Sequence, residues 1–141
     1  MAASDTSVLV AGVGGVIGRN VAAEYARSGV RVRGVSWRKV AGEGWDRITA
    51  DLSDVDGAQR ALAGLVDVTH LVFAAYTHRA VLAERVEPNV TLLKNTLEAL
   101  RHNGSHLRRV TLYPGNKAYG SHLGRFKTPA KEADARSYST A

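Results

Sequence analysis

Gly12-Val13-Gly14-Gly15-Val16-Ile17-Gly18 is the stretch that decides the fold of this chain. An apolar run at residues 8–11 precedes it, and a helical pattern of apolar residues follows it. A strand, a glycine-rich turn and a helix in this order bind the pyrophosphate of a dinucleotide. The glycines fit G-x-x-G-x-x-G, because Ile17 stands where G-x-G-x-x-G would require glycine.

The three spaced glycines have separate predicted roles. Gly12 permits the tight turn out of the strand, Gly15 lets the backbone approach the diphosphate, and Gly18 lets the helix pack close to the sheet. The helix N-terminus offers amide donors and the positive end of its dipole to an anion. These features predict nucleotide binding, and the alternative is that the glycines only shape a turn.

Apolar segments recur along the chain in a pattern typical of alternating strands and helices. We expect strands at residues 7–11, 30–36, 46–50, 69–75 and 107–113, and helices at 16–28, 54–64 and 79–103. This alternation predicts an α/β fold, a Rossmann-type doubly wound parallel sheet of about five strands in the order 3-2-1-4-5. Pro88 lies inside the last helical stretch, where we expect a kink or a break.

We divide the chain into a dinucleotide-binding Rossmann domain, residues 1–113, and an active-site-like loop and C-terminal tail, residues 114–141. A doubly wound dinucleotide fold usually adds a sixth strand and another helix. One edge or face of the fifth strand would therefore lack its usual cover. A partner subunit, a missing part of the polypeptide or the tail could fill the gap. We expect a homo-oligomer or a chain completed by a second chain.

The composition argues against several classes of function. The chain has 141 residues and no cysteine, which excludes disulfides, thiolate zinc sites and cysteine nucleophiles. Its histidines lack the spacing of a metal site, and no apolar run approaches the roughly 20 residues of a membrane span. The net charge of +6 is not gathered in a dense tract or an aromatic-basic motif. We expect a cytoplasmic protein that binds a small-molecule substrate, without metal, nucleic acid or membrane partner.

Arg38 and Lys39 follow the second expected strand, where NAD-preferring sites usually carry an acid. No acid lies between Gly34 and Ala41. Two cations there suit a 2′-phosphate, because arginine grips it with paired donors and lysine neutralises it. The pattern favours NADP over NAD, against the alternative of a surface turn with two solvated bases. Trp37 either lies over the adenine or caps the sheet.

Three further strand ends are expected on the same side of the sheet. Asp51 either accepts a hydrogen bond from the adenine amino group, with Leu52 packed on the ring, or caps the next turn. Ala74 is small and leaves room for the cofactor at the switch point, although core packing explains it equally well. After the fifth strand, Lys117 could bind the cofactor ribose or stabilise an enolate, and Tyr119 could donate a proton. Both are also ordinary surface residues.

Four segments carry a family resemblance: the glycine motif, Asp51-Leu52-Ser53-Asp54, Asp67-Val68-Thr69-His70 and Pro114-Gly115-Asn116-Lys117-Ala118-Tyr119. Together they resemble the extended short-chain dehydrogenase/reductases, and most of all the progesterone 5β-reductase and iridoid synthase group. The similarity runs from about Val8 to Arg136 and covers the N-terminal cofactor-binding part. The resemblance implies NADPH-dependent reduction of enones, with hydride added at the β-carbon and the enolate oxygen stabilised by a tyrosine assisted by a lysine.

By position in the motif, Lys117 matches the family lysine and Asn89 matches an asparagine that supports the site. Two departures are that Pro114 stands in place of threonine, and that the family's catalytic tyrosine lies on a helix beyond this chain. The predicted cofactor-binding residues, most of them implied by the resemblance, are Gly12, Val13, Gly15, Val16, Ile17, Gly18, Ser36, Trp37, Arg38, Lys39, Asp51, Leu52, Ala74, Ala75 and Tyr76.

The sequence thus predicts an NADPH-dependent short-chain dehydrogenase/reductase-like protein that reduces an enone or carbonyl small molecule. Lys117 and Tyr119 are its predicted catalytic residues. The alternative is a truncated, redox-inactive homologue that binds a nucleotide or catalyses a non-redox step such as cyclisation or isomerisation.

Overall fold

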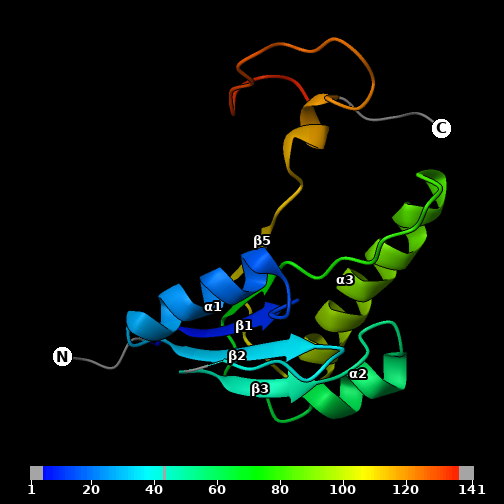
Figure 1. Ribbon diagram of the computed structural model, residues 1–141. Coiled ribbons are helices and arrows are strands. Elements are labelled where there is room, and N and C mark those ends of the chain that lie inside the picture. Colours follow the sequence, from blue (N-terminus) through cyan, green and yellow to red (C-terminus); the bar gives the residue numbers. More distant parts are fainter. Residues whose placement is uncertain (1–4, 43, 137–141) are drawn as a thin grey trace.

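The computed structural model describes residues 5–42 and 44–136. Within them, five parallel strands form one sheet in the order β3-β2-β1-β4-β5 (Figure 1). The strands are β1 (Ser7–Ala11), β2 (Arg31–Ser36), β3 (Asp46–Thr49), β4 (His70–Phe73) and β5 (Arg109–Leu112). The helices are α1 (Val16–Arg27), α2 (Val55–Leu62) and α3 (Val86–His102), with short 3-10 helices η1 (Ala83–Arg85) and η2 (Asn116–Tyr119). The predicted fold class and strand order are confirmed.

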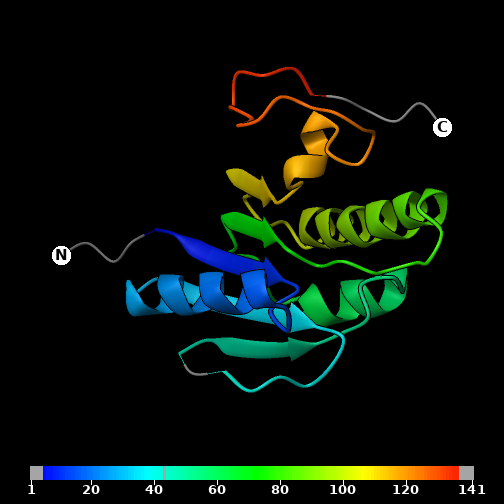
Figure 2. The same cartoon turned by 45° about the horizontal axis from the view of Figure 1, so that its top comes forward.

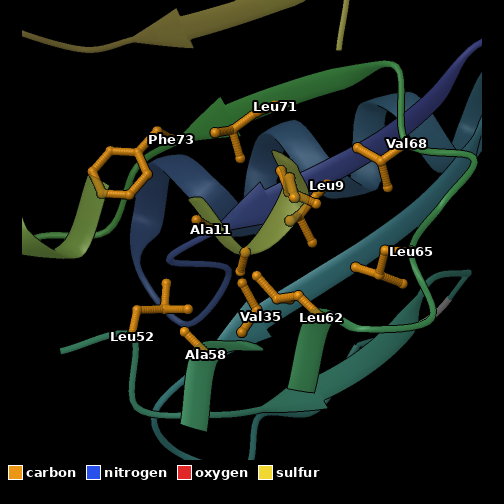
Figure 3. Packing of buried hydrophobic residues seen from close by; sticks show 12 residues of the cluster. Leu9, Ala11, Val35, Leu52, Ala58, Leu62, Leu65, Val68, Leu71 and Phe73 are labelled. Atoms are coloured by element: carbon orange, nitrogen blue, oxygen red, sulfur yellow. The ribbon is translucent and has the colours of Figure 1, made fainter. Parts of the chain in front are cut away.

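Helices cover both faces of the sheet, and β1 shows why. Its side chains alternate between faces, so Val8 and Val10 pack with Ala22 of α1. Leu9 and Ala11 belong to a larger cluster with residues of α2 and α3 (Figure 3). These four side chains of β1 are fully buried, which explains why residues 8–11 of this central parallel strand form an unbroken apolar run.

The helix before β5 differs from its prediction. Residues 79–82 are not helical, and α3 begins at Val86, after the turn η1. Pro88 does not break α3, which is continuous from Val86 to His102, so the expected break at this residue is wrong. It is the third residue of α3 and lies in the first turn, where a backbone amide has no partner within the helix and proline is tolerated.

β5 lies at one edge of the sheet and lacks cover on one face, as expected. Val110 and Leu112 pair in register with Leu71 and Phe73, which places them on the face that α2 and α3 cover. Yet Val110 is 42% exposed and Leu112 is 50% exposed. Figures 1 and 2 show residues 114–136 leading away from the sheet. The described part of the tail therefore does not bury this apolar surface.

Candidate nucleotide-binding cleft

The carboxyl ends of β1, β2, β3 and β4 meet at a cleft of about 710 Å³. Ligands of doubly wound sheets bind at this edge, beside the switch point, which here lies between β1 and β4. Its volume falls in the range of roughly 300–1,000 Å³ that small-molecule sites occupy. The lining residues are Gly12, Gly14, Gly15, Val35, Ser36, Trp37, Arg38, Val40, Ala50, Asp51, Leu52, Ser53, Ala74, Ala75, Tyr76, Thr77, His78, Arg79, Pro88 and Leu92.

Two of the motif glycines are required by close packing within the protein. Gly12 has φ +85°, and a Cβ atom there would lie 2.5 Å from the backbone nitrogen of Ala75. A Cβ atom on Gly18 would lie 2.2 Å from the carbonyl oxygen of Gly12. The turn thus packs against the end of β4, and α1 packs against the turn. Both geometries agree with the roles predicted from the motif.

Gly15 is different, because the protein leaves room for a side chain there. A Cβ atom on Gly15 would meet only the carbonyl oxygen of Gly12, at an ordinary 3.5 Å. Gly15 is the N-cap of α1, where no side chain caps the helix and no acid lies in the first turn. The first amides of α1 and the positive end of its dipole are therefore available to an anion beside Gly15.

The loop after β2 brings a cation to the rim of the cleft. The Ser36 hydroxyl donates a hydrogen bond to the carbonyl oxygen of Arg38 (2.5 Å). The Arg38 guanidinium lies 3.9 Å from the centre of the Trp37 ring, close enough for a cation–π interaction. Trp37 is 68% exposed, so it does not cap the sheet. Its ring instead supports Arg38 beside the cleft.

Asp51 caps the turn after β3, one of its two predicted roles. Its Oδ1 accepts hydrogen bonds from the amide (2.9 Å) and the hydroxyl (2.6 Å) of Ser53. These bonds, the hydroxyl's foremost, lower the pKa of Asp51. Asn95 of α3 holds the same loop, because its Nδ2 donates to the carbonyl oxygens of Leu52 (2.9 Å) and Ser53 (3.2 Å).

Asn89 holds the loop after β4, which forms another wall of the cleft. Its Oδ1 accepts a hydrogen bond from the amide of Thr77 (2.8 Å), and its Nδ2 donates to the Thr77 carbonyl oxygen (2.9 Å). The same Nδ2 also donates to the carbonyl oxygen of Arg85 (2.7 Å). α3 thus fixes the loop at the switch point, in agreement with the supporting role that the resemblance implies for Asn89.

The structure brings most of the predicted cofactor-binding residues together in this cleft. They are Gly12, Gly15, Ser36, Trp37, Arg38, Asp51, Leu52, Ala74, Ala75 and Tyr76. The others, Val13, Val16, Ile17, Gly18 and Lys39, are not among its lining residues. Val13 is buried beneath the turn against Gly34, and the side chains of Val16 and Ile17 are exposed. Lys39 lines a neighbouring cavity that also includes Arg38.

The predicted catalytic residues, Lys117 and Tyr119, lie on η2 after β5. Neither is among the lining residues of the cleft. Lys117 is exposed, and Tyr119 lines a separate cavity of about 350 Å³ built by residues 119–135. Their catalytic role remains a prediction.

Several lining residues were missed by the sequence prediction. Thr77, His78 and Arg79 directly follow Tyr76, the last residue predicted to bind the cofactor after the fourth strand, so extending that segment along the chain would have found them. Pro88 and Leu92 come from α3 and carry no local signal. Only the packing of α3 against the sheet brings them to the cleft.

Neither a metal site nor a membrane-spanning helix is found in residues 5–42 and 44–136. No group of three or more histidine, cysteine, aspartate or glutamate side chains is arranged to hold a metal ion there. None of the helices in these residues combines the length and the apolar character needed to cross a membrane.

Comparisons of sequence identify relatives. Residues 44–136 match the family described as PRISE-like Rossmann-fold domain. A 3-oxo-Delta(4,5)-steroid 5-beta-reductase from Arabidopsis thaliana is 32% identical over 131 residues, which cover 86% of this chain and 33% of the relative. An (S)-8-oxocitronellyl enol synthase from Nepeta cataria is 31% identical over 132 residues, covering 87% of this chain and 33% of the relative. The chain thus spans about a third of the length of these relatives.

Solved structures show the same architecture. A short-chain dehydrogenase/reductase superfamily protein from Agrobacterium tumefaciens with bound NAD matches with a TM-score of 0.64 and 25% identity, over 80% of this chain and 34% of that one. The enzyme WbmH from Bordetella bronchiseptica, in complex with NAD+, matches with a TM-score of 0.71 over 94% of this chain and 46% of that one. Its identity of 16% supports the fold alone. The predicted resemblance is confirmed, and the chain belongs to the PRISE-like Rossmann-fold domain family.

Proposed function

We propose that this chain binds NADPH in the cleft and takes part in reducing an enone or carbonyl small molecule. The observation that carries the proposal is the convergence of the uncapped N-terminus of α1, Gly15 and Arg38 on one cleft at the switch point. The donors suit a dinucleotide, since a helix N-terminus favours a pyrophosphate and arginine favours a phosphate monoester.

Each part of the cofactor has a fitting partner in this proposal. Gly15 and the N-terminus of α1 would hold the pyrophosphate, and Arg38 and Lys39 would hold the 2′-phosphate. Asp51 and Leu52, which line the cleft at the end of β3, would hold the adenine. Small side chains at the end of β4, Ala74 and Ala75, leave room for the remainder of the cofactor at the switch point.

The proposed chemistry follows from the cofactor and from two residues after β5. When bound, NADPH would supply the hydride that the β-carbon of the enone takes up. Lys117 would stabilise the negative charge that develops on the enolate oxygen, and Tyr119 would donate the proton that completes the reduction. A steroid 5-beta-reductase and an enol synthase among the relatives support this substrate class.

The second candidate is a redox-inactive homologue that binds a nucleotide or catalyses a non-redox step such as cyclisation or isomerisation. One observation favours it: Lys117 and Tyr119 do not line the cleft, and Tyr119 lines a separate cavity. Acid–base groups in that position suit a reaction that does not need the nicotinamide.

NADPH oxidation distinguishes the two functions. The chain is incubated with NADPH and a panel of cyclic and open-chain enones, and absorbance at the NADPH band is followed. Reductase activity predicts oxidation that requires both chain and enone and that falls when Lys117 is replaced by methionine. Tight NADPH binding without oxidation across the panel contradicts reduction by this chain and supports the redox-inactive candidate.

The exposed apolar face of β5 leads to a proposal about assembly. We expect that Val110 and Leu112 are covered by another copy of this chain or by a second chain. We also expect the protein to be cytoplasmic. Apolar surface of this kind is removed from water by association. Sedimentation velocity tests the homo-oligomer, and a monomer at all accessible concentrations would contradict it.

A further inference from the structure

A second cavity, of about 540 Å³, lies beside the nucleotide cleft. Ser36, Arg38 and Val40 line both, so the two spaces adjoin along the loop after β2. Two cations, Lys39 and Arg47, line this second cavity but not the nucleotide cleft. Arg47 lies on β3, outside every motif that the sequence prediction used.

The register of the sheet places Arg47 on the same face as the glycine turn. Arg47 pairs with Gly34 of β2, and paired residues of parallel strands present their side chains on the same face. Gly34 faces Val13 of the turn, because a Cβ atom on Gly34 would lie 2.8 Å from the Val13 side chain. The neighbouring Ile48 packs in the cluster on the opposite face. Arg47 is therefore directed to the side where the turn and α1 lie.

Among the residues that the structure describes, the charges lining this cavity are of one sign. Arg38, Lys39 and Arg47 line it, and no acidic residue of 5–42 or 44–136 does. None of the three forms an ion pair within residues 5–42 and 44–136. Three unpaired cations around one cavity repel one another and attract an anion, and low-dielectric walls strengthen this attraction. The cavity thus has the electrostatics of a phosphate site.

We propose that Arg47 is a specificity-determining residue that completes, with Arg38 and Lys39, a site for a phosphate monoester. The inference rests on the proposed function, in which that group is the 2′-phosphate of NADPH. Arg47 approaches it from β3, whereas Arg38 and Lys39 approach from the loop after β2. Cations from two elements enclose the phosphate from two directions, which a loop alone would not do.

The test compares two nucleotides that differ only by the phosphate. Adenosine 2′,5′-bisphosphate and adenosine 5′-monophosphate are titrated into the full chain and into variants Arg47→Gln, Arg38→Gln and Arg109→Gln. Arg109 is the matched control, since it is an exposed arginine on the other edge strand, β5, without an ion pair among the described residues. NADPH, NADH and inorganic phosphate alone are each titrated in parallel.

We expect Arg47→Gln to weaken binding of the bisphosphate by about fivefold or more. A loss of this size lies between the contribution of an exposed ion pair and that of a hydrogen bond to a charged group. Binding of the monophosphate and NADH stays unchanged, and Arg109→Gln leaves all affinities unchanged. If Arg38→Gln lowers the preference for the bisphosphate and Arg47→Gln does not, the inference is wrong while the proposed function stands. If the chain binds neither NADPH nor NADH, the proposed function fails. Loss of inorganic phosphate binding in Arg47→Gln would still support the anion site in that case, and retention would overturn it.

Discussion

At the scale of single residues, the three motif glycines separate into two kinds. Gly12 and Gly18 are glycine because a Cβ atom would collide with backbone inside the protein. Gly15 has an ordinary extended conformation, φ −86° and ψ 169°, and its Cβ position is open. The protein alone therefore gives no reason for glycine at position 15. A ligand backbone or phosphate lying against this residue does give one.

Replacing Gly15 and Gly18 by alanine, one at a time, tests that distinction. Gly15→Ala is expected to cost less than about 1 kcal/mol of stability, since alanine is only a poorer N-cap than glycine. It should weaken NADPH binding at least about tenfold, because its methyl group occupies the position of the pyrophosphate. Gly18→Ala should instead lower the free energy of unfolding by about 1–3 kcal/mol or more through overpacking. Urea unfolding and calorimetric titration measure both quantities, and unchanged NADPH affinity in Gly15→Ala contradicts the assignment.

At the scale of elements, α3 organises the cleft without supplying its chemistry. Asn89 fixes the loop after β4, and Asn95, which is 7% exposed, fixes the loop after β3. A third asparagine, Asn103 at the end of the helix, donates to the carbonyl oxygen of Leu62 at the end of α2 (2.5 Å). Asparagine side chains of this helix and its C-cap thus hold the backbone of neighbouring segments at three places, of which two lie at the cleft and one lies away from it.

Asn95 and Asn103 form a matched pair for testing this role. Either alanine variant should lose about 1–3 kcal/mol of stability, because buried carbonyl oxygens lose their donor. Only Asn95→Ala should also weaken binding of adenosine 5′-monophosphate, since it releases Leu52 and Ser53 beside the predicted adenine position. Equal nucleotide affinities in the two variants, at temperatures where both are folded, would show that Asn95 is purely structural.

The sequence predicted which strands and helices occur better than it predicted the residues where they end. Apolar runs such as Val8 to Ala11 predicted the strands, because buried parallel strands carry continuous apolar residues. The strand ends were predicted too long where apolar residues such as Leu107 pack on the core outside a strand. The 3-10 helix η2 was not predicted, because its four residues are too few to show a helical period. The strand-end site residues were predictable because carboxyl ends of parallel strands meet, whereas Leu92 depends on helix packing.

At the scale of the whole molecule, Arg33 links β2 to β1 and to the segment before β4, at the end of the sheet opposite the cleft. Arg33 of β2 has a side chain only 6% exposed, and it donates to Asp67, just before β4, at 2.8 Å. The same guanidinium donates to the Ser7 hydroxyl of β1 at 2.7 Å. Hydrogen bonding from Arg33 lowers the pKa of Asp67 below its ordinary value of 3.8, and burial opposes this effect.

This pair predicts how stability depends on pH. Because the pKa of Asp67 is lower in the folded chain than in the unfolded one, its contribution is present above pH 3.8 and is lost as pH falls through the folded value. Asp67→Asn should cost about 1–3 kcal/mol at pH 7, between the values for an exposed and a buried pair, since Arg33 is 6% exposed but Asp67 is 39% exposed. The difference from the unmodified chain should shrink as the pH falls below 3.8.

Arg31 supplies the control, because it contacts the same carboxylate at 3.2 Å from a side chain that is 63% exposed. Arg31→Ala should cost less than about 1 kcal/mol. Urea unfolding of both variants between pH 7 and pH 3 measures these differences. A cost for Asp67→Asn that is independent of pH would contradict the account of this pair.

We propose that the cleft at the carboxyl ends of β1 to β4 holds NADPH. Calorimetric titration of the chain with NADPH and NADH under identical conditions tests this proposal. We expect saturable binding of NADPH with an affinity at least about tenfold higher than that of NADH, a difference of roughly 1.4 kcal/mol. Absence of binding for both nucleotides would contradict the claim altogether, and equal or tighter binding of NADH would contradict the assignment of Arg38, Lys39 and Arg47 to the 2′-phosphate.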